Sequence, residues 1–590
     1  MILWSDKNIY DRMIDRFTQR KQVYDRFKPD RDAMAEYFRL DLDIEVDERT
    51  NQLILGREIY EGTGPWAARV MATGFQGKLM SKSIDWIMYE MGQQELQGID
   101  ELDIWCQKIK EYMATSYQQG NFYDVQPNFT LDGITIGSPV MFCEEDISTS
   151  RIMWIPEHYN QCYVFYDKYN QPEGIIVKDE TWTAKKIDDE FCEGNSQEQR
   201  QQDRNTKLSV GLAKQLENGN FYEKYTVYRA VFKATDLLWD NPDFKKPIGN
   251  PRWISIYFEE GCKQDRKNEP LRTDPYYNKP FVVWDYNKKP WHASSSTPAF
   301  EAYHDVKSQQ QVHKNFLENI QNKTRGAVVH LNTMTNRLDL GPEGLMAVDV
   351  AEYDRPPKRI ETLGDILLDE KLSAMLGEAV KRHFHHDQLL TFMKRLQDGR
   401  APLNNLETMK LDAESASFLS PFIESHSRYL ADCDEVAMGF EIMSGRGPFA
   451  PDVMANITDV IMSNITRPLD KITVRPVFIG PLHKMQKISQ QIEPIRTGVA
   501  IVAEMAAELG DPDMASLMIK QYKTADKALE AVNFPQDCVN TEEDYNQAKA
   551  ALTQQRMEAE QAKMAIETMK ASKNIQGPVD KDSIMAGMAK

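Results

Sequence analysis

The densest group of potential metal ligands in the sequence is the run that holds His383, His385, His386 and Asp387. Imidazole nitrogens and carboxylate oxygens are common ligands of zinc, so a metal-dependent enzyme is one hypothesis. On a helix, however, His383 and His386 share a face while His385 points away. At most two imidazoles and Asp387 then converge, unless a distant residue such as His426 joins them. The spacing favours a solvated or intersubunit helix surface, with the enzyme as the alternative.

A phosphate-binding loop is the second chemical possibility, and its nearest match is GFQGKL, from Gly74 to Leu79. Such a loop needs another glycine five positions before Gly77 and a serine or threonine after Lys78 to hold magnesium. Ala72 and Leu79 stand at those positions. The run therefore predicts small residues on a packed helix. No order of Ser, His, Asp or Cys singles out a nucleophile either, and we expect no catalytic residue, metal or cofactor.

Charge is distributed unevenly along this chain. It carries 71 Lys and Arg against 90 Asp and Glu, a formal net charge of −19 at pH 7, which argues against a conventional binder of duplex DNA. Residues 241–290 reverse the balance, with ten basic against seven acidic side chains. Aromatic residues interleave with this basic segment as in single-strand binders, but we favour the core of a small sheet. The segment indicates a separate partner surface, with these candidate residues: Lys245, Lys246, Arg266 and Lys267.

Length and composition are typical of a folded protein with several units. The chain has 590 residues, of which 41% are hydrophobic and 27% charged. Its seven cysteines include no C-x-x-C pair, which argues against a disulfide framework or a zinc module. No stretch approaches the roughly 18 apolar residues of a membrane-spanning helix, and the N-terminus lacks a signal-peptide pattern. We expect a protein of the reducing cytoplasm without a membrane partner.

Apolar periodicity predicts a mixture of helices and strands in the first half of the chain. The expected helices are an amphipathic stretch at 7–39, a stripe from Pro65 to Met88 and another from Leu102 to Tyr117. Beyond Gly120, glycines and prolines predict short extended runs, with strands to about residue 179. Residues 193–206 contain no apolar side chain and predict a flexible connection. Further extended segments are expected at 222–233 and 253–258.

The second half is predicted to be mainly helical. Thr297 and Pro298 open a helix of some 25 residues, on the order of 35–40 Å long. Two long helices follow at about 363–397 and 405–440, interrupted by Gly399 and Pro402, which predict a loop tip. The remaining elements are a strand at 472–479 and helices at 482–509, 512–532 and 541–571.

Taken in order, these segments resemble the podovirus-type bacteriophage portal, or head-to-tail connector, family over nearly the whole chain. The first similar stretch is residues 61–87, EGTGPWAARVMATGFQGKLMSKSIDWI, followed by SYQQGNFY at 116–123 and GITIGSPVMFCEED at 133–146. Residues 297–315, TPAFEAYHDVKSQQQVHKN, resemble the helix after the family's insertion, although Ala293–Ser296 replaces an expected Gly-rich run. Residues 396–414, LQDGRAPLNNLETMKLDAE, resemble its channel loop and helix.

The resemblance implies a mainly helical α+β portal fold, made of wing, stem, clip and crown regions with a C-terminal barrel helix. The implied regions are wing 1–180, stem helix 181–221, clip 222–295, second stem helix 296–325, wing 326–440 with channel loop 397–404, crown 441–540, and barrel helix and tail 541–590. An external turn between antiparallel helices is the alternative for the loop. The implied channel residues are Lys394, Arg395, Gln397, Arg400, Asn404 and Asn405.

The implied function is mechanical rather than enzymatic. The family forms a dodecameric ring at one capsid vertex, through which double-stranded DNA enters and leaves without sequence-specific contacts. Its partners would be the terminase large subunit, tail adaptor proteins, and the major capsid and scaffold proteins, with assembly in the host cytoplasm. The nearer alternative is another structural virion protein of the tail or scaffold, and the more distant one is the metal-dependent enzyme at His383 and His386.

Overall fold

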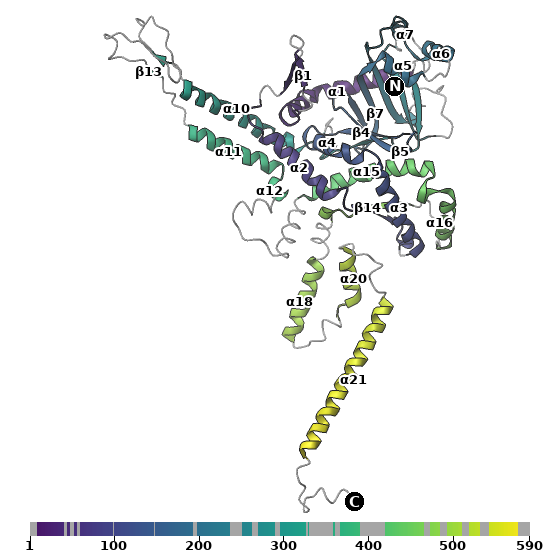
Figure 1. The fold of residues 1–590 in the computed structure, drawn as a ribbon, viewed down its shortest axis with the longest axis vertical. Coiled ribbons are helices and arrows are strands. Elements are labelled where there is room, and N and C mark those ends of the chain that lie inside the picture. Colours follow the sequence, from purple (N-terminus) through teal and green to yellow (C-terminus); the bar gives the residue numbers. More distant parts are fainter. Residues whose placement is uncertain are drawn as a thin grey trace, which may run out of the picture. The chain divides into compact units, whose positions relative to one another are not determined.

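Helices predominate in the computed structural model of this chain, and antiparallel sheets occupy much of its first half (Figure 1). The expected α+β class is confirmed. The chain divides into a first unit, Met1–Thr408 with Phe418–His483, and a second unit, Met409–Ser417 with Lys484–Lys590. The structure describes residues 9–40, 44–47, 52–55, 59–97, 99–146, 148–192, 197–236, 251–261, 270–289, 295–325, 328–329, 358–359, 366–389, 419–464, 473–483, 493–509, 518–531 and 542–575.

Three N-terminal helices follow the predicted apolar stripes. They are α1 (Ile9–Phe38), α2 (Thr63–Leu79) and α3 (Asp100–Gln119). On α2 the predicted face is buried, and Met71 and Phe75 are both fully inaccessible to solvent. The amphipathic pattern was sufficient here because each helix buries one continuous stripe.

Two neighbouring segments differ from the expectation. The helix expected to reach Met88 ends at Leu79, and β3 (Ile87–Met91) pairs antiparallel with the distant strand β14 (Val474–Phe478). The strand conformation of this segment depends on a partner nearly 400 positions away in the sequence, and local periodicity cannot reveal such a partner.

The second difference is α4 (Phe122–Thr135), which forms where short extended runs were expected. It contains Pro127 and Gly133, both of which are unfavourable in helix interiors. Buried side chains on α4, among them Phe122 and Phe129, show that tertiary packing outweighs local propensity there. Gly133 also lies so close to the Trp284 ring that a Cβ at this position would be 2.1 Å from it.

Two antiparallel sheets lie at the centre of the first unit. In the described residues, the larger has the strand order β10-β9-β8-β7-β6 and the smaller β11-β4-β5. Their strands are β4 (Val140–Asp146), β5 (Arg151–Glu157), β6 (Cys162–Tyr166), β7 (Pro172–Thr183), β8 (Lys224–Lys233), β9 (Trp253–Glu259), β10 (Arg272–Tyr276) and β11 (Phe281–Val283). The extended segments expected at 222–233 and 253–258 are confirmed as β8 and β9.

Apolar side chains cover both faces of the larger sheet. One core lies between the two sheets and consists of Val140, Phe142, Cys162, Val164, Ile175, Val177, Val231, Phe281 and Val283. On the other face α1 packs against the sheet through Met13, Phe17 and Tyr24. Tyr228 and Phe232 are buried beneath α1, so these aromatic residues serve as sheet core, as predicted.

On the outer edges of two strands, side chains rather than another strand form hydrogen bonds with backbone groups. On β6, the amide of Val164 donates to the Tyr24 hydroxyl at 3.2 Å, and its carbonyl oxygen accepts from Arg20 Nε at 2.6 Å. On β5, the Asn121 side chain both donates to and accepts from the backbone of Trp154, at 2.8 and 2.7 Å. Such contacts keep these strand edges from pairing with another chain.

Residues 181–221 do not form the single helix that the resemblance implied. Their described part holds the end of β7 and the helices α5 (Ala184–Phe191), α6 (Gln197–Lys207) and α7 (Val210–Glu217). The expectation of a flexible connection at 193–206 was also wrong for α6. This helix lacks an apolar stripe, but Arg204 binds Asp188 through two hydrogen bonds of 2.6 Å, which supplies the missing tertiary contact.

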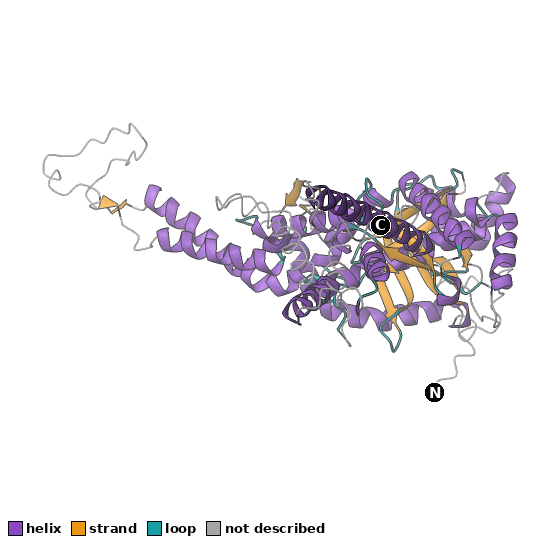
Figure 2. Ribbon diagram, turned by 90° about the horizontal axis from the view of Figure 1, so that it is seen from below, coloured by secondary structure: helices purple, strands orange, loops and turns teal. Residues whose placement is uncertain are grey.

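Two long helices of the first unit pack side by side. α10 (Pro298–Arg325) matches the predicted helix and begins as expected, with the Thr297 hydroxyl accepting from the Phe300 amide at 3.1 Å. α11 (Ile366–His383) lies along it, and Asn319 of α10 donates to Asp369 of α11 at 2.8 Å. Figure 2 shows this pair extending away from the sheets, with the paired strands β12 (Val328–Val329) and β13 (Lys358–Arg359) at its far end.

The remaining helices of the first unit follow α11. They are α12 (His386–Leu389), α15 (Ser420–Ser444) and α16 (Pro451–Asn464). The strand expected at 472–479 is confirmed as β14.

The second unit contains α18 (Glu493–Leu509), α20 (Gln521–Ala531) and α21 (Glu542–Ile575), in agreement with the three predicted helices. Tyr522 of α20 packs against Tyr545 of α21, with ring centroids 5.5 Å apart. Nowhere in the described residues is a helix both long and apolar enough to span a membrane.

Candidate functional site

The residues expected to contact DNA or docking partners lie outside the described residues. The channel residues Lys394, Arg395, Gln397, Arg400, Asn404 and Asn405 lie outside the described residues, as does the whole loop 397–404. The same holds for the candidate docking residues Lys245, Lys246, Arg266 and Lys267. Their roles therefore remain predictions. The described elements on either side of them show only which parts of the fold they connect.

The strands around the docking residues separate them into two pairs. Lys245 and Lys246 lie in the connection from β8 to β9, and Arg266 and Lys267 lie in the connection from β9 to β10. Because β9 pairs antiparallel with both neighbours, these connections leave from its opposite ends. A strand of this length spans roughly 20 Å, so the two pairs are best tested as separate patches.

The histidine cluster has other partners than a metal. His383 Nε2 lies 3.1 Å from Asp305 Oδ2 on α10, and the His386 ring packs on Trp66 with centroids 4.9 Å apart. His385 has a φ of 52° and interrupts the helix between α11 and α12. In the described part of the chain, no three His, Cys, Asp or Glu side chains gather as a metal site would require.

His426, considered as a distant metal ligand, lies in an aromatic core. Its ring is fully buried and packs against Trp284, Phe422 and Tyr429, with centroid distances of 5.3 to 5.7 Å. Burial, together with the nearby His483, lowers the pKa of His426 to about 3. The imidazole is therefore neutral near pH 7 and forms part of the core.

The glycine run that resembles a phosphate-binding loop lies within α2. Gly74 to Leu79 are helical, Phe75 and Leu79 are buried, and Lys78 falls in the last turn. A phosphate-binding loop precedes its helix and exposes successive backbone amides to the ligand. The backbone amides of Gly74 to Leu79 instead lie inside a helix. The prediction of small residues on a packed helix is confirmed.

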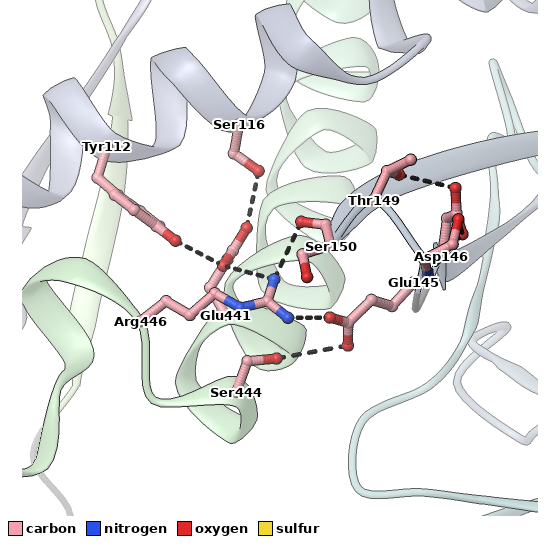
Figure 3. A network of polar contacts seen from close by, with 10 residues as sticks. Tyr112, Ser116, Glu145, Asp146, Thr149, Ser150, Glu441, Ser444 and Arg446 are labelled. Carbon is pink, nitrogen blue, oxygen red and sulfur yellow. Dashed lines mark hydrogen bonds and ion pairs between the residues drawn. The ribbon is translucent and has the colours of Figure 1, made fainter.

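A polar network not foreseen from the sequence joins the end of α15 to the turn between β4 and β5 (Figure 3). Arg446 is its central cation. Its guanidinium pairs with Glu145, donates to the carbonyl oxygen of Ser150 at 3.1 Å and lies 3.9 Å from Glu441. Gly445 ends α15 with a φ of 60°, a left-handed conformation that glycine adopts readily and that turns the chain at Arg446.

The buried carboxylate of this network is Glu441, which is 3% exposed. It accepts hydrogen bonds from Tyr112 at 2.9 Å and from Ser116 at 2.8 Å, both on α3 (Figure 3). Burial, and then the bond to Glu441, raises the pKa of Tyr112 to about 12. These groups satisfy one another and tie α3, α15 and β4 together, so their role is structural. The only local signal in the sequence was the turn-forming run GRGP at 445–448.

A cavity of about 360 Å³ lies at the N-terminus of α7. Glu259, which is 2% exposed, lines it and accepts from the hydroxyl and the amide of Ser209, the first at 2.8 Å. A helix N-terminus attracts anions, and here the protein's own carboxylate already occupies that position. The cavity therefore offers no phosphate site comparable to that of a nucleotide-binding enzyme.

Comparison with known proteins gives one extensive match. The sequence model of a family described as bacteriophage head to tail connecting protein matches residues 11–539. This match covers both units and nearly all described elements. A search of curated proteins found no match.

Proposed function

Because this chain belongs to the bacteriophage head-to-tail connecting protein family, we propose that it forms a dodecameric portal ring through which the genome is packaged and ejected. The family consists of structural virion proteins, and a connector joins the head to the tail at a capsid vertex. Capsid and tail components are therefore its partners. The observation that carries the proposal is the family match over residues 11–539.

We infer that α10 and α11 are the stem pair and that residues 326–365 between them belong to the clip. Three observations support this change from the boundaries first expected. The two helices pack along each other and project from the sheets (Figure 2). Residues 181–221 supply only shorter helices. Strands from 222–295 pair with β4 and β7, which groups that segment with the wing.

The proposed channel loop follows this stem pair. Residues 397–404 lie between α12 and α15, both in the first unit, and their polar and basic side chains suit transient contacts with phosphates. Lys394, Arg395 and Arg400 would attract the backbone weakly, while Gln397, Asn404 and Asn405 would form hydrogen bonds without fixed charge. The overall charge of −19 would otherwise repel DNA and allow it to slide.

The proposed partners are the terminase large subunit during packaging, tail adaptors afterwards, and the major capsid and scaffold proteins during assembly in the host cytoplasm. Lys245, Lys246, Arg266 and Lys267 remain candidate docking residues on the basic segment. If the clip is instead residues 326–365, these side chains belong to the wing and are more suited to capsid or scaffold contacts.

The proposal is tested by infection in which synthesis of this chain is blocked. We expect capsid-related particles that contain no genome and carry no tail, because DNA has no entry and the tail no attachment point. Supplying the chain in trans should restore filled heads, as measured by nuclease-protected DNA. Filled, tailed particles formed without the chain would overturn the proposal.

A further inference from the structure

Asp434 is a buried carboxyl at the point where three elements of the first unit meet. It lies on α15 and is 1% exposed. Its Oδ1 accepts a hydrogen bond from the hydroxyl of Tyr89 on β3 at 2.5 Å and another from that of Tyr117 on α3 at 3.1 Å. These elements come from distant parts of the sequence, so this one side chain joins them.

No cation among the described residues forms an ion pair with Asp434. Two other buried acids do have a cation nearby, because Asp188 binds Arg204 and Glu441 lies 3.9 Å from Arg446. Placing an unpaired carboxylate in a protein interior is costly, and the neutral acid avoids most of that cost. Proton uptake is therefore the physical alternative to an ion pair at this position.

The titratable groups around Asp434 do not replace the missing cation. They are Tyr89 on β3, Tyr117 on α3, and Asp432, Cys433 and Glu435 beside it on α15. The nearby cation Lys279 pairs with Asp432, at 3.7 Å. Of the charged residues in the β3–β14 pair, Glu90 and Arg475 lie opposite each other. They alternate with Tyr89 and Pro476 and so project from the other face.

We propose that the contact of α15 with β3 and α3 depends on the protonation state of Asp434. The neutral carboxyl holds the three elements firmly together, and the ionised carboxylate loosens their contact. β3 pairs with β14, and β14 is followed closely by His483, where the first unit ends. The protonation state of Asp434 therefore determines how firmly β3 and β14 are held in the first unit. This inference concerns the folded chain itself and does not depend on the proposed function.

The direction of the pH effect follows from the burial of the carboxyl. Burial raises the pKa of Asp434 to about 7, although the two tyrosine hydrogen bonds lower it in part. A group whose pKa is raised on folding contributes its full stability below the pKa of the unfolded chain, near 4 for aspartate. That contribution is lost as the pH rises towards 7.

The test is backbone hydrogen exchange in the intact protein between pH 6 and pH 8, corrected for the intrinsic pH dependence of exchange. We expect the opening of residues 87–91 and 474–478 to become about tenfold more favourable over this range. Asp434→Asn keeps an acceptor for both tyrosines but stays neutral, so its opening should change little with pH. Tyr117→Phe removes a bond that favours the ionised form and should shift the transition to higher pH.

Asp188→Asn is the matched control, because it neutralises a buried acid that does have a cation. It should keep the wild-type pH dependence at residues 87–91, even if it destabilises α5 and α6. Equal pH dependence in the wild type and in Asp434→Asn would overturn the proposal. If Asp434→Asn does not fold, a wild type without the expected change between pH 6 and pH 8 would overturn it alone.

Discussion

At the scale of single residues, this fold depends on contacts that substitute for missing backbone partners or allow close approach. Arg20, Tyr24 and Asn121 occupy the hydrogen-bonding positions that a further strand would use on β6 and β5. Gly133 lets α4 contact the Trp284 ring directly. These roles could not be read from the sequence, because each residue acts on a partner more than 30 positions away.

Two helical glycines provide a matched test of this packing. Gly133→Ala places a Cβ 2.1 Å from the Trp284 ring and should destabilise the first unit by about 1–3 kcal/mol, as overpacking does. Gly77→Ala has no atom within 4 Å of the new Cβ and should be neutral or stabilise α2 by up to about 1 kcal/mol. Thermal unfolding of both variants measures the difference. Equal effects would mean that the Gly133 contact does not limit packing.

At the scale of elements, the sequence was informative where a helix buries one continuous stripe. α1, α2, α3 and α10 were predicted for this reason, and the strands β8, β9 and β14 from their β-branched and aromatic residues. The sequence did not predict α4, α6 or β3, because their conformation depends on partners outside the segment. These partners are the buried contacts of α4, the pair of Arg204 with Asp188 for α6, and β14 for β3. A local pattern carries no information about such partners.

The candidate site was less accessible to sequence reasoning than the fold. The glycine run of α2 was correctly interpreted as structural, and the spacing of His383 and His386 correctly argued for a helix surface. The network around Arg446 and Glu441 was missed because its paired residues are far apart in the sequence. Arg446 is 301 positions from Glu145, and Glu441 is 329 positions from Tyr112. The channel residues rest mainly on the family resemblance, and the docking residues rest also on the basic excess of residues 241–290.

The channel loop leads to a prediction at the same scale. Replacing residues 397–404 with a Gly/Ser linker of equal length should preserve assembly but reduce the yield or retention of packaged DNA, because twelve copies at a bore would meet every passing phosphate. Packaged DNA per particle, measured in complementation, is the readout. A linker of the same composition in place of residues 167–171, a turn between β6 and β7, serves as the control. Normal DNA yield and particle stability with the first replacement would instead favour an external turn.

At the scale of the whole molecule, the acidic chain combines a layered first unit with a helical second unit. Most described residues of α21 are exposed, among them Leu552, Met557, Met564 and Ile566. A helix of 34 residues with so little buried surface gains stability mainly from neighbours. In a ring, copies of the same chain would supply them, and the barrel helix at 541–571 stays a prediction.

The most direct test of the portal assignment is electron microscopy of the purified chain with analysis of particle symmetry. The account predicts closed rings with a central opening and dodecameric symmetry in end-on views. Rings should persist when His383 and His386 are replaced by glutamine, since the account assigns these side chains no metal. Particles that are only monomers or open fibres at every concentration examined would contradict the account and return the chain to the wider group of structural virion proteins.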